Sequence, residues 1–113
     1  MKVKTTEYGT TKEILKYQAH HVAIAAMIDD TGITANADGK KIVPAGTLVT
    51  GLGDDVVVLA NDDTTQGIIL SDVDVTHGKA PCAVVVHGFI DLTKIPEAPE
   101  PDAIAALPMI KFL

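Results

Sequence analysis

Four histidines and a single cysteine are the side chains of this chain that could bind a metal ion or act as nucleophiles. His20 and His21 are adjacent, so in a strand their side chains point to opposite faces of a sheet. Cys82 and His87 are five residues apart, which also predicts opposite faces. Neither pair has the spacing of a zinc site, so we predict no catalytic residue, no metal site and no cofactor. A small enzyme or metal-binding protein that uses His77, Cys82 and His87 is the least favoured hypothesis.

Paired acidic residues offer carboxylates for calcium binding or for acid–base catalysis. Residues 36–39 superficially resemble a calcium loop, but Thr34 stands where the leading acid belongs and Ala45 where the closing glutamate belongs. The glycines at 51 and 53 are followed by two aspartates, which would repel a phosphate group. We therefore interpret most of the acidic residues as solvated loop residues.

The bulk composition indicates one small acidic domain with an aliphatic core. Of the 113 residues, 47% are hydrophobic and 21% are charged, which argues against disorder and allows a single domain. The formal net charge of −6 disfavours a nucleic-acid partner. No signal peptide and no membrane-spanning apolar run is visible, so we expect synthesis in the cytoplasm and no membrane association.

Short β-prone segments separated by turn residues predict a mainly β (α+β) domain, folded as a compact sandwich or barrel. The apolar residues 20–28 are expected to form a strand. The Asp-Gly pair at 38–39 predicts a hairpin turn, with residues 33–37 and 41–43 as its two strands.

The second half of the chain predicts three more strands and one helix. Residues 56–60 should form a short buried strand. Residues 67–76 and 82–92 should pair as an antiparallel hairpin, because both are rich in β-branched residues and a turn separates them. Residues 102–107 are the predicted short C-terminal helix, preceded by a proline suited to its first turn.

The two ends of the chain differ from the body between them. Residues 1–18 are predicted to be an extended N-terminal arm ahead of a β-rich domain over residues 19–113. Residues 1–16 hold four lysines against two glutamates, whereas the rest holds five lysines against thirteen acids. The charge pattern is compatible with an arm that docks on an acidic neighbour and equally with a solvated N-terminal tail. The apolar residues 109–113 should pack on the sheet or on a neighbouring subunit.

Three short motifs follow one another along the chain. Residues 40–47 read KKIVPAGT, residues 67–76 read GIILSDVDVT and residues 84–92 read VVVHGFIDL. In order and spacing they resemble the head decoration (head fibre) proteins of tailed phages, where a K-I-[VL]-x-A-G-T corner precedes G-I-L-L-x-D-V-D-V-T and G-F-V-D-L strands. The resemblance covers residues 28–113. His87 departs from the pattern, because an apolar residue is more usual there.

The resemblance implies a structural protein similar to lambda-type head decoration proteins, with a β-tulip-type domain. Such proteins bind the major capsid protein on the outer surface of the virion head, commonly as homotrimers at three-fold positions, and stabilise the mature shell. The arm side chains expected to contact the shell are Lys2, Val3, Lys4, Lys12 and Lys16, and the side chains expected at the subunit interface are Met109, Ile110, Phe112 and Leu113.

A virion-displayed module that binds a receptor or a glycan is the alternative hypothesis. Aromatic residues make up only 4% of the chain, which offers few rings for stacking on sugars. We therefore favour the decoration hypothesis.

Overall fold

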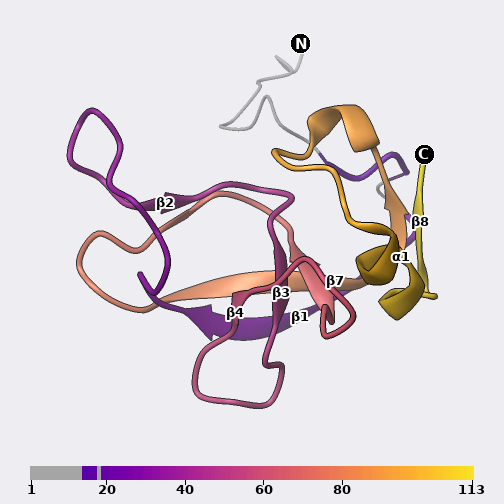
Figure 1. Cartoon of the computed structure of the whole chain (residues 1–113), viewed down its shortest axis with the longest axis horizontal. Helices are drawn as coiled ribbons and strands as arrows, with labels where there is room; N and C mark the ends of the chain where they lie inside the picture. Colours follow the sequence, from indigo (N-terminus) through magenta and orange to yellow (C-terminus); the bar gives the residue numbers. More distant parts are fainter. Residues whose placement is uncertain (1–13, 18) are drawn as a thin grey trace, which may run out of the picture.

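The structure, a computed structural model, describes residues 14–17 and 19–113. It is mainly β, with a six-stranded sheet, a separate two-stranded sheet and one short α-helix. Figure 1 shows α1 and β8 together at one end of the molecule. The elements are β1 (His21–Ile28), β2 (Ile42–Val43), β3 (Leu48–Thr50), β4 (Val58–Leu59), β5 (Gly67–Ile69), β6 (Val73–Asp74), β7 (Ala80–Ile90), the 3-10 helix η1 (Leu92–Lys94), α1 (Pro101–Ala106) and β8 (Ile110–Phe112).

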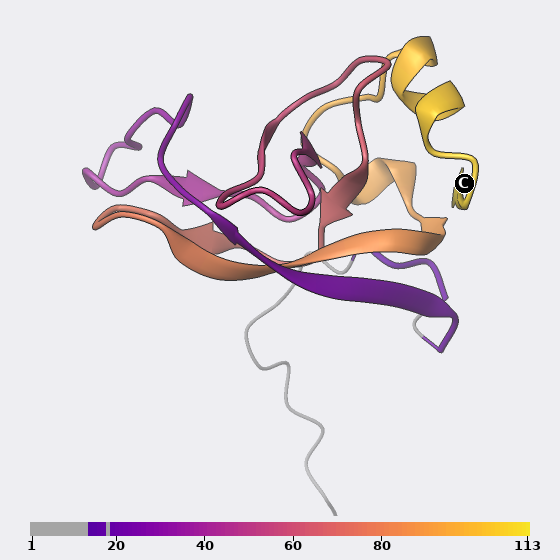
Figure 2. The ribbon, with the colours of Figure 1, turned by 90° about the horizontal axis from the view of Figure 1, so that it is seen from below.

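The six-stranded sheet is organised around β7, its longest strand. The order β1-β7-β5-β3-β4 is antiparallel throughout, and β8 pairs parallel with the end of β7. Figure 2 shows β1 and β7 side by side along one side of the molecule, with the other elements on the opposite side. A bridge between Ile28 of β1 and Val57, which precedes β4, links the two ends of this strand order.

The central strands are buried on both faces, which explains their uninterrupted apolar sequences. Neighbouring residues of β3, β5 and β7 point to opposite faces and enter two different clusters, as Val84 and Val85 do. We call one of them the terminal cluster, because it joins these strands to both ends of the described chain. We call the other the central cluster, because it joins them to segments in the middle of the chain. The terminal cluster comprises Ile14, Leu15, Ala45, Leu48, Ile68, Val85, Ile90, Ala103, Leu107 and Ile110, and the central cluster comprises Ile28, Val43, Val49, Val57, Ile69, Val73, Val75 and Val84.

A β-bulge opposite the start of β1 changes which residues of β7 face the terminal cluster. In the pairing of β7 with β1, Val22 lies opposite His87 and Ala23 lies opposite Val85, so Val86 has no partner residue in β1. Val85 and Ile90 consequently belong to the same cluster although five residues separate them. The prediction that Cys82 and His87 lie on opposite faces is therefore wrong, because it assumed an unbroken alternation along the strand.

The predicted hairpin between residues 67–76 and 82–92 is correct only for its first part. β5 pairs antiparallel with β7 through Ile68 and Ile69. The chain then bends away, and β6 pairs with β2 in the small sheet instead. The carboxylate of Asp72, at the bend, accepts a hydrogen bond from the backbone N–H of Ala45 at 2.7 Å, which holds this departure in place.

The Asp-Gly turn at 38–39 forms, but it does not join two strands. The side-chain oxygen of Asn36 accepts hydrogen bonds from the backbone N–H groups of Asp38 and Lys40, at 2.9 and 3.1 Å. Gly39 has the positive φ of 77° that such a turn requires. Residues 33–37 are not a strand, and β2 pairs with β6, so the predicted hairpin is wrong.

Two other predictions have mixed outcomes. The strand over residues 20–28 is confirmed as β1, and the C-terminal helix is confirmed as α1, which begins at Pro101. The predicted buried strand over residues 56–60 is reduced to β4, whose two side chains are exposed. Val57, just before β4, is the residue of this segment that enters the central cluster.

The folded domain includes part of the predicted arm. Ile14 and Leu15 are buried in the terminal cluster, and the backbone N–H of Lys16 donates to the carbonyl of Phe89 at 2.9 Å. The predicted boundary after residue 18 is therefore too late, because two core residues were assigned to the arm. At the other end, the apolar tail packs on the sheet as β8, the first of its two predicted positions.

Candidate functional site

The histidines and the cysteine do not converge on one site. Cys82 is half-buried against the central cluster, and this burial raises the pKa of its thiol, the opposite of what a reactive thiolate needs. His77 lies in an exposed turn between β6 and β7. Among residues 14–17 and 19–113, no group of three or more His, Cys, Asp or Glu side chains is arranged to hold a metal ion.

His20 and His87 belong instead to a cluster of rings on β7. The ring centroid of His20 lies 5.2 Å from that of His87 and 5.5 Å from that of Phe89. Tyr17 packs edge-on against Phe89, with 5.4 Å between centroids. The Nδ1 atom of His87 lies 2.9 Å from the carbonyl oxygen of Met109, which gives this polar residue a defined partner. These contacts fasten the segment before β1 and the turn before β8 to β7.

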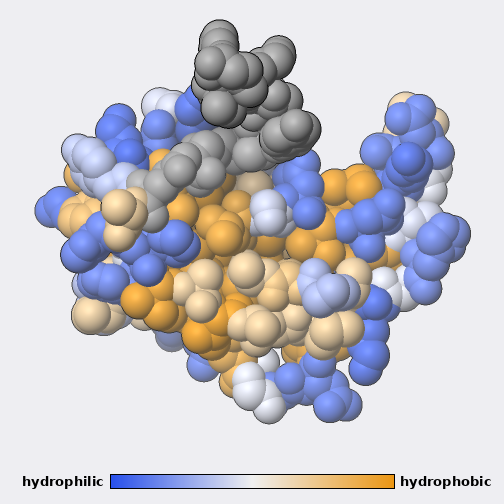
Figure 3. Space-filling model, turned by 180° about the vertical axis from the view of Figure 1, so that it is seen from behind, coloured by the Kyte–Doolittle hydropathy of each residue, from blue (hydrophilic) through white to orange (hydrophobic). Residues whose placement is uncertain are grey.

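One side of the sheet exposes large apolar side chains. Figure 3 shows a broad apolar area across this side, between polar ends. β1 also forms an edge of the sheet and contains no Asp, Glu, Lys, Arg or Pro, the residues that normally keep an edge strand from pairing with another chain. We call this surface the outer face; its large, well-exposed side chains are Tyr17, Val22, Ile24, Met109 and Leu113.

The sequence-predicted interface residues separate into two sets along β8. Ile110 is only 5% exposed and offers almost no free surface, whereas Phe112 is half-buried against the terminal cluster and exposes part of its side chain. Met109 is 59% exposed and Leu113 is 41% exposed, and both point to the outer face. The alternation of side chains along a strand explains the division, because successive residues of β8 point to opposite faces. The predicted arm residues Lys2, Val3, Lys4 and Lys12 lie outside the described residues, and Lys16 is exposed.

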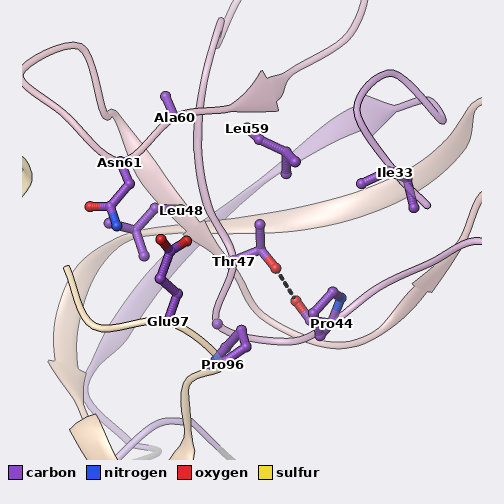
Figure 4. Close-up of a pocket in the computed structure, with 10 residues that line it drawn as sticks. Ile33, Pro44, Thr47, Leu48, Leu59, Ala60, Asn61, Pro96 and Glu97 are labelled. Carbon is purple, nitrogen blue, oxygen red and sulfur yellow. Dashed lines mark hydrogen bonds between the residues drawn. The ribbon is translucent and has the colours of Figure 1, made fainter. Parts of the chain in front are cut away.

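A groove of about 350 Å³ lies between β3, β4 and the proline-rich segment that follows η1 (Figure 4). Within it, the hydroxyl of Thr47 donates to the carbonyl of Pro44 at 2.7 Å, so this polar group is already satisfied. The groove is therefore mainly apolar, with one carboxylate. Its principal lining residues are Pro44, Thr47, Leu48, Leu59, Pro96 and Glu97.

Two contacts hold the proline-rich segment beside the groove. Gly46 has a φ of +92°, and a Cβ there would lie 2.6 Å from Cγ2 of Ile95, so glycine permits the close approach. The amide nitrogen of Asn61 donates to the carbonyl of Ala98 at 3.1 Å, and its amide oxygen accepts from the N–H of Glu100 at 2.8 Å. Sequence reasoning missed this groove because its walls are about fifty residues apart in the chain. The Pro-Ala-Gly sequence at residues 44–46 was the one local pattern that could have indicated a close approach of another segment.

Three Asp-x-Thr sequences form the same local turn. In each, one carboxylate oxygen accepts hydrogen bonds from both the backbone N–H and the hydroxyl of the threonine two residues later. The threonine hydroxyl is the main cause that lowers the pKa of each aspartate. These acids therefore stabilise turns, in agreement with their interpretation as loop residues. The pairs are Asp62 with Thr64, Asp74 with Thr76, and Asp91 with Thr93.

The sequence matches no protein-family model, and no curated protein is significantly similar to it. In the described part of the chain, no helix has the length and apolar character needed to cross a bilayer.

Proposed function

We propose that this protein decorates the outer surface of a tailed-phage or prophage head, where it binds the major capsid protein and stabilises the mature shell. The outer face carries the proposal. It combines well-exposed apolar side chains with an uncharged edge strand, and such a surface is typical of a protein that works by assembling with others. The three motifs that resemble decoration proteins supply the kind of partner.

The motifs also meet in space, which favours a shared β-tulip-type fold. The backbone N–H of Lys41, in the first motif, donates to the hydroxyl of Thr76, in the second, at 2.9 Å. The N–H of Gly46 donates to the carbonyl of Ile69 at 2.8 Å. The second motif in turn pairs with the third through β5 and β7. The three motifs are therefore joined by hydrogen bonds into one structural unit.

In the proposed assembly, homotrimers occupy three-fold positions of the shell, and the basic arm reaches into the capsid surface. Because Ile14 and Leu15 are core residues, the arm is limited to residues 1–13. Many identical weak contacts on a closed shell gain strength through multivalency. Each single contact can therefore be modest.

Co-sedimentation with expanded, undecorated capsids from the phage or prophage that encodes the chain tests the proposal. The intact protein should pellet with the capsids and saturate at a fixed ratio to the major capsid protein. Absence of binding at any protein concentration would contradict the decoration function. Binding of the isolated protein to a glycan array, without capsid binding, would favour the receptor-binding alternative.

A pair of charge-reversal variants tests the arm separately. Replacing Lys2, Lys4 and Lys12 with glutamate should weaken capsid binding by on the order of tenfold or more, because three favourable charges become unfavourable. The matched control reverses three exposed lysines of the body, Lys40, Lys79 and Lys94, and should bind like the wild type. Equal loss in both variants would mean that net charge, not the arm, governs binding.

A further inference from the structure

The turn before β8 holds the backbone of Met109 in place while its apolar side chain is exposed. The carbonyl oxygen of Met109 accepts a hydrogen bond from the N–H of Gly88 at 3.2 Å and lies 2.9 Å from Nδ1 of His87. Its side chain is nevertheless the most exposed large apolar one among the residues that the structure describes. Lys111 and Leu113 follow on the same side of β8, because the residues between them face the terminal cluster. We call Met109, Lys111 and Leu113 the β8 knob.

The groove beside β3 and β4 has complementary properties. Its volume of about 350 Å³ suits one or two aliphatic side chains rather than a folded domain. Glu97 adds a carboxylate to its lining, and Lys111 adds a positive charge to the knob. Within the described ranges neither Glu97 nor Lys111 has an ion-pair partner. The apolar side chains that line the groove are Ile33, Pro44, Leu48, Leu59, Ala60 and Pro96, of which Leu48 is largely buried at its base.

Knob and groove lie on different sides of the terminal cluster. Leu48 belongs to that cluster and also lines the groove. Ile110 enters the same cluster from β8, while the knob side chains point away from it. The core therefore separates the two surfaces, and the knob cannot enter the groove of its own chain.

We infer that the β8 knob of one copy docks in the groove of a second copy, with Lys111 paired to Glu97. The inference rests on the proposed capsid function, for which it supplies the contact between subunits. Because the two surfaces differ, the contact is head-to-tail and repeats around a rotation axis until a ring closes, as a trimer does. The backbone of the knob is already fixed, so docking orders little besides side chains, and methionine adapts readily to an apolar groove.

Site-specific cross-linking tests the contact in the full-length chain. In a Cys82→Ala background, Glu97→Cys and Lys111→Cys are made as separate variants and as a double variant, then treated with a short bis-maleimide. Each single variant should remain uncross-linked, their equimolar mixture should give a covalent dimer, and the double variant should give a covalent trimer. A Lys111→Cys variant that cross-links to itself would overturn the inference, because Lys111 would then lie beside Lys111 of a second copy and not beside Glu97.

Charge reversal measures the pairing by sedimentation equilibrium. Glu97→Lys and Lys111→Glu should each lower the association constant about fivefold, as expected for an exposed ion pair. The double reversal should restore it, whereas Lys79→Glu, an exposed control, should leave it unchanged. A double variant no better than either single variant, or a wild-type chain that stays monomeric up to millimolar concentration, overturns the contact.

Failure of this contact and failure of the capsid function are distinguishable. If Lys111→Glu decorates capsids with wild-type affinity and occupancy, the knob–groove contact is wrong and the capsid function stands. If the cross-linked trimer forms but does not bind capsids, the contact stands and the capsid function is wrong.

Discussion

The terminal and central clusters share the strands β3, β5 and β7 but are completed by different parts of the chain. The terminal cluster needs Ile14 near one end and Ile110 near the other. The central cluster is closed by β2 and β6, which lie in the middle of the chain. The carboxylate of Asp72 beside β6 accepts a hydrogen bond from the backbone N–H of Ala45 beside β2, which ties the two strands together. Changes at the chain ends should therefore act on the terminal cluster alone, although that end of the molecule also carries the proposed contacts.

The largest expected effect comes from truncation at the N-terminus. Deletion of residues 1–13 keeps Ile14 and Leu15, whereas deletion of residues 1–16 removes both from the terminal cluster. Each lost aliphatic side chain costs about 2–5 kcal/mol, so the longer deletion should lower the free energy of unfolding by on the order of 4 kcal/mol or more relative to the shorter one. Urea unfolding followed by circular dichroism measures the difference. Equal midpoints would place these residues outside the core.

Two neighbouring residues of β8 sharpen the comparison between core and outer face. Ile110→Ala should cost about 2–5 kcal/mol of unfolding free energy, because it leaves a cavity in the terminal cluster. Met109→Ala should change it by less than about 0.5 kcal/mol, because that side chain faces solvent. The same unfolding measurement applies. A costly Met109→Ala in the monomer would show that the outer face is covered within the chain itself.

Glycine substitutions probe the corner that joins the terminal cluster to the groove. Gly46→Ala combines a left-handed backbone, about 1–2 kcal/mol, with overlap against Ile95 that adds about 1–3 kcal/mol. Gly39 also has a positive φ, but an added Cβ would meet no other atom there. Gly39→Ala should therefore carry only the cost of the left-handed backbone. Thermal unfolding should rank Gly46→Ala as clearly the less stable variant. The reverse order would mean that the proline-rich segment does not pack on the corner.

The smallest expected effect concerns the Asp-x-Thr turns and pH. The Thr64 hydroxyl lowers the pKa of Asp62, so the folded state favours the charged carboxylate. This stabilisation is present above the ordinary aspartate value of about 3.9 and is lost as the pH falls through the lower folded value. Thr64→Ala should make the loss of stability below about pH 4 slightly shallower, while Thr34→Ala, an exposed control, should not. Identical slopes in both variants would show that the turn does not affect the titration.

The sequence predicted those elements whose signals are local. The uncharged apolar run of β1 and the proline-led helix α1 were both recognisable from neighbouring residues. The turn at 38–39 was also recognisable, because Asp-Gly favours positive φ.

The remaining features depend on partners that are distant in the chain. The pairing of β6 with β2 is accompanied by a hydrogen bond from the N–H of Ala45 to the carboxylate of Asp72, two residues that are 27 positions apart in the chain. The bulge at Val86 reverses the side-chain alternation within one apolar run, so periodicity could not locate it. The groove was missed for the same reason, since only folding brings Gly46 and Ile95 together. For the candidate site, the sequence pattern placed Met109 and Leu113 among the predicted interface residues but could not separate these exposed side chains from the buried Ile110.

The central claim, that this chain assembles on a phage head, is tested most directly by electron cryomicroscopy of expanded, undecorated capsids incubated with the purified protein. We expect additional density on the outer surface at three-fold positions, with three copies of the domain around each axis. Capsids that carry no additional density at saturating protein concentration would contradict it.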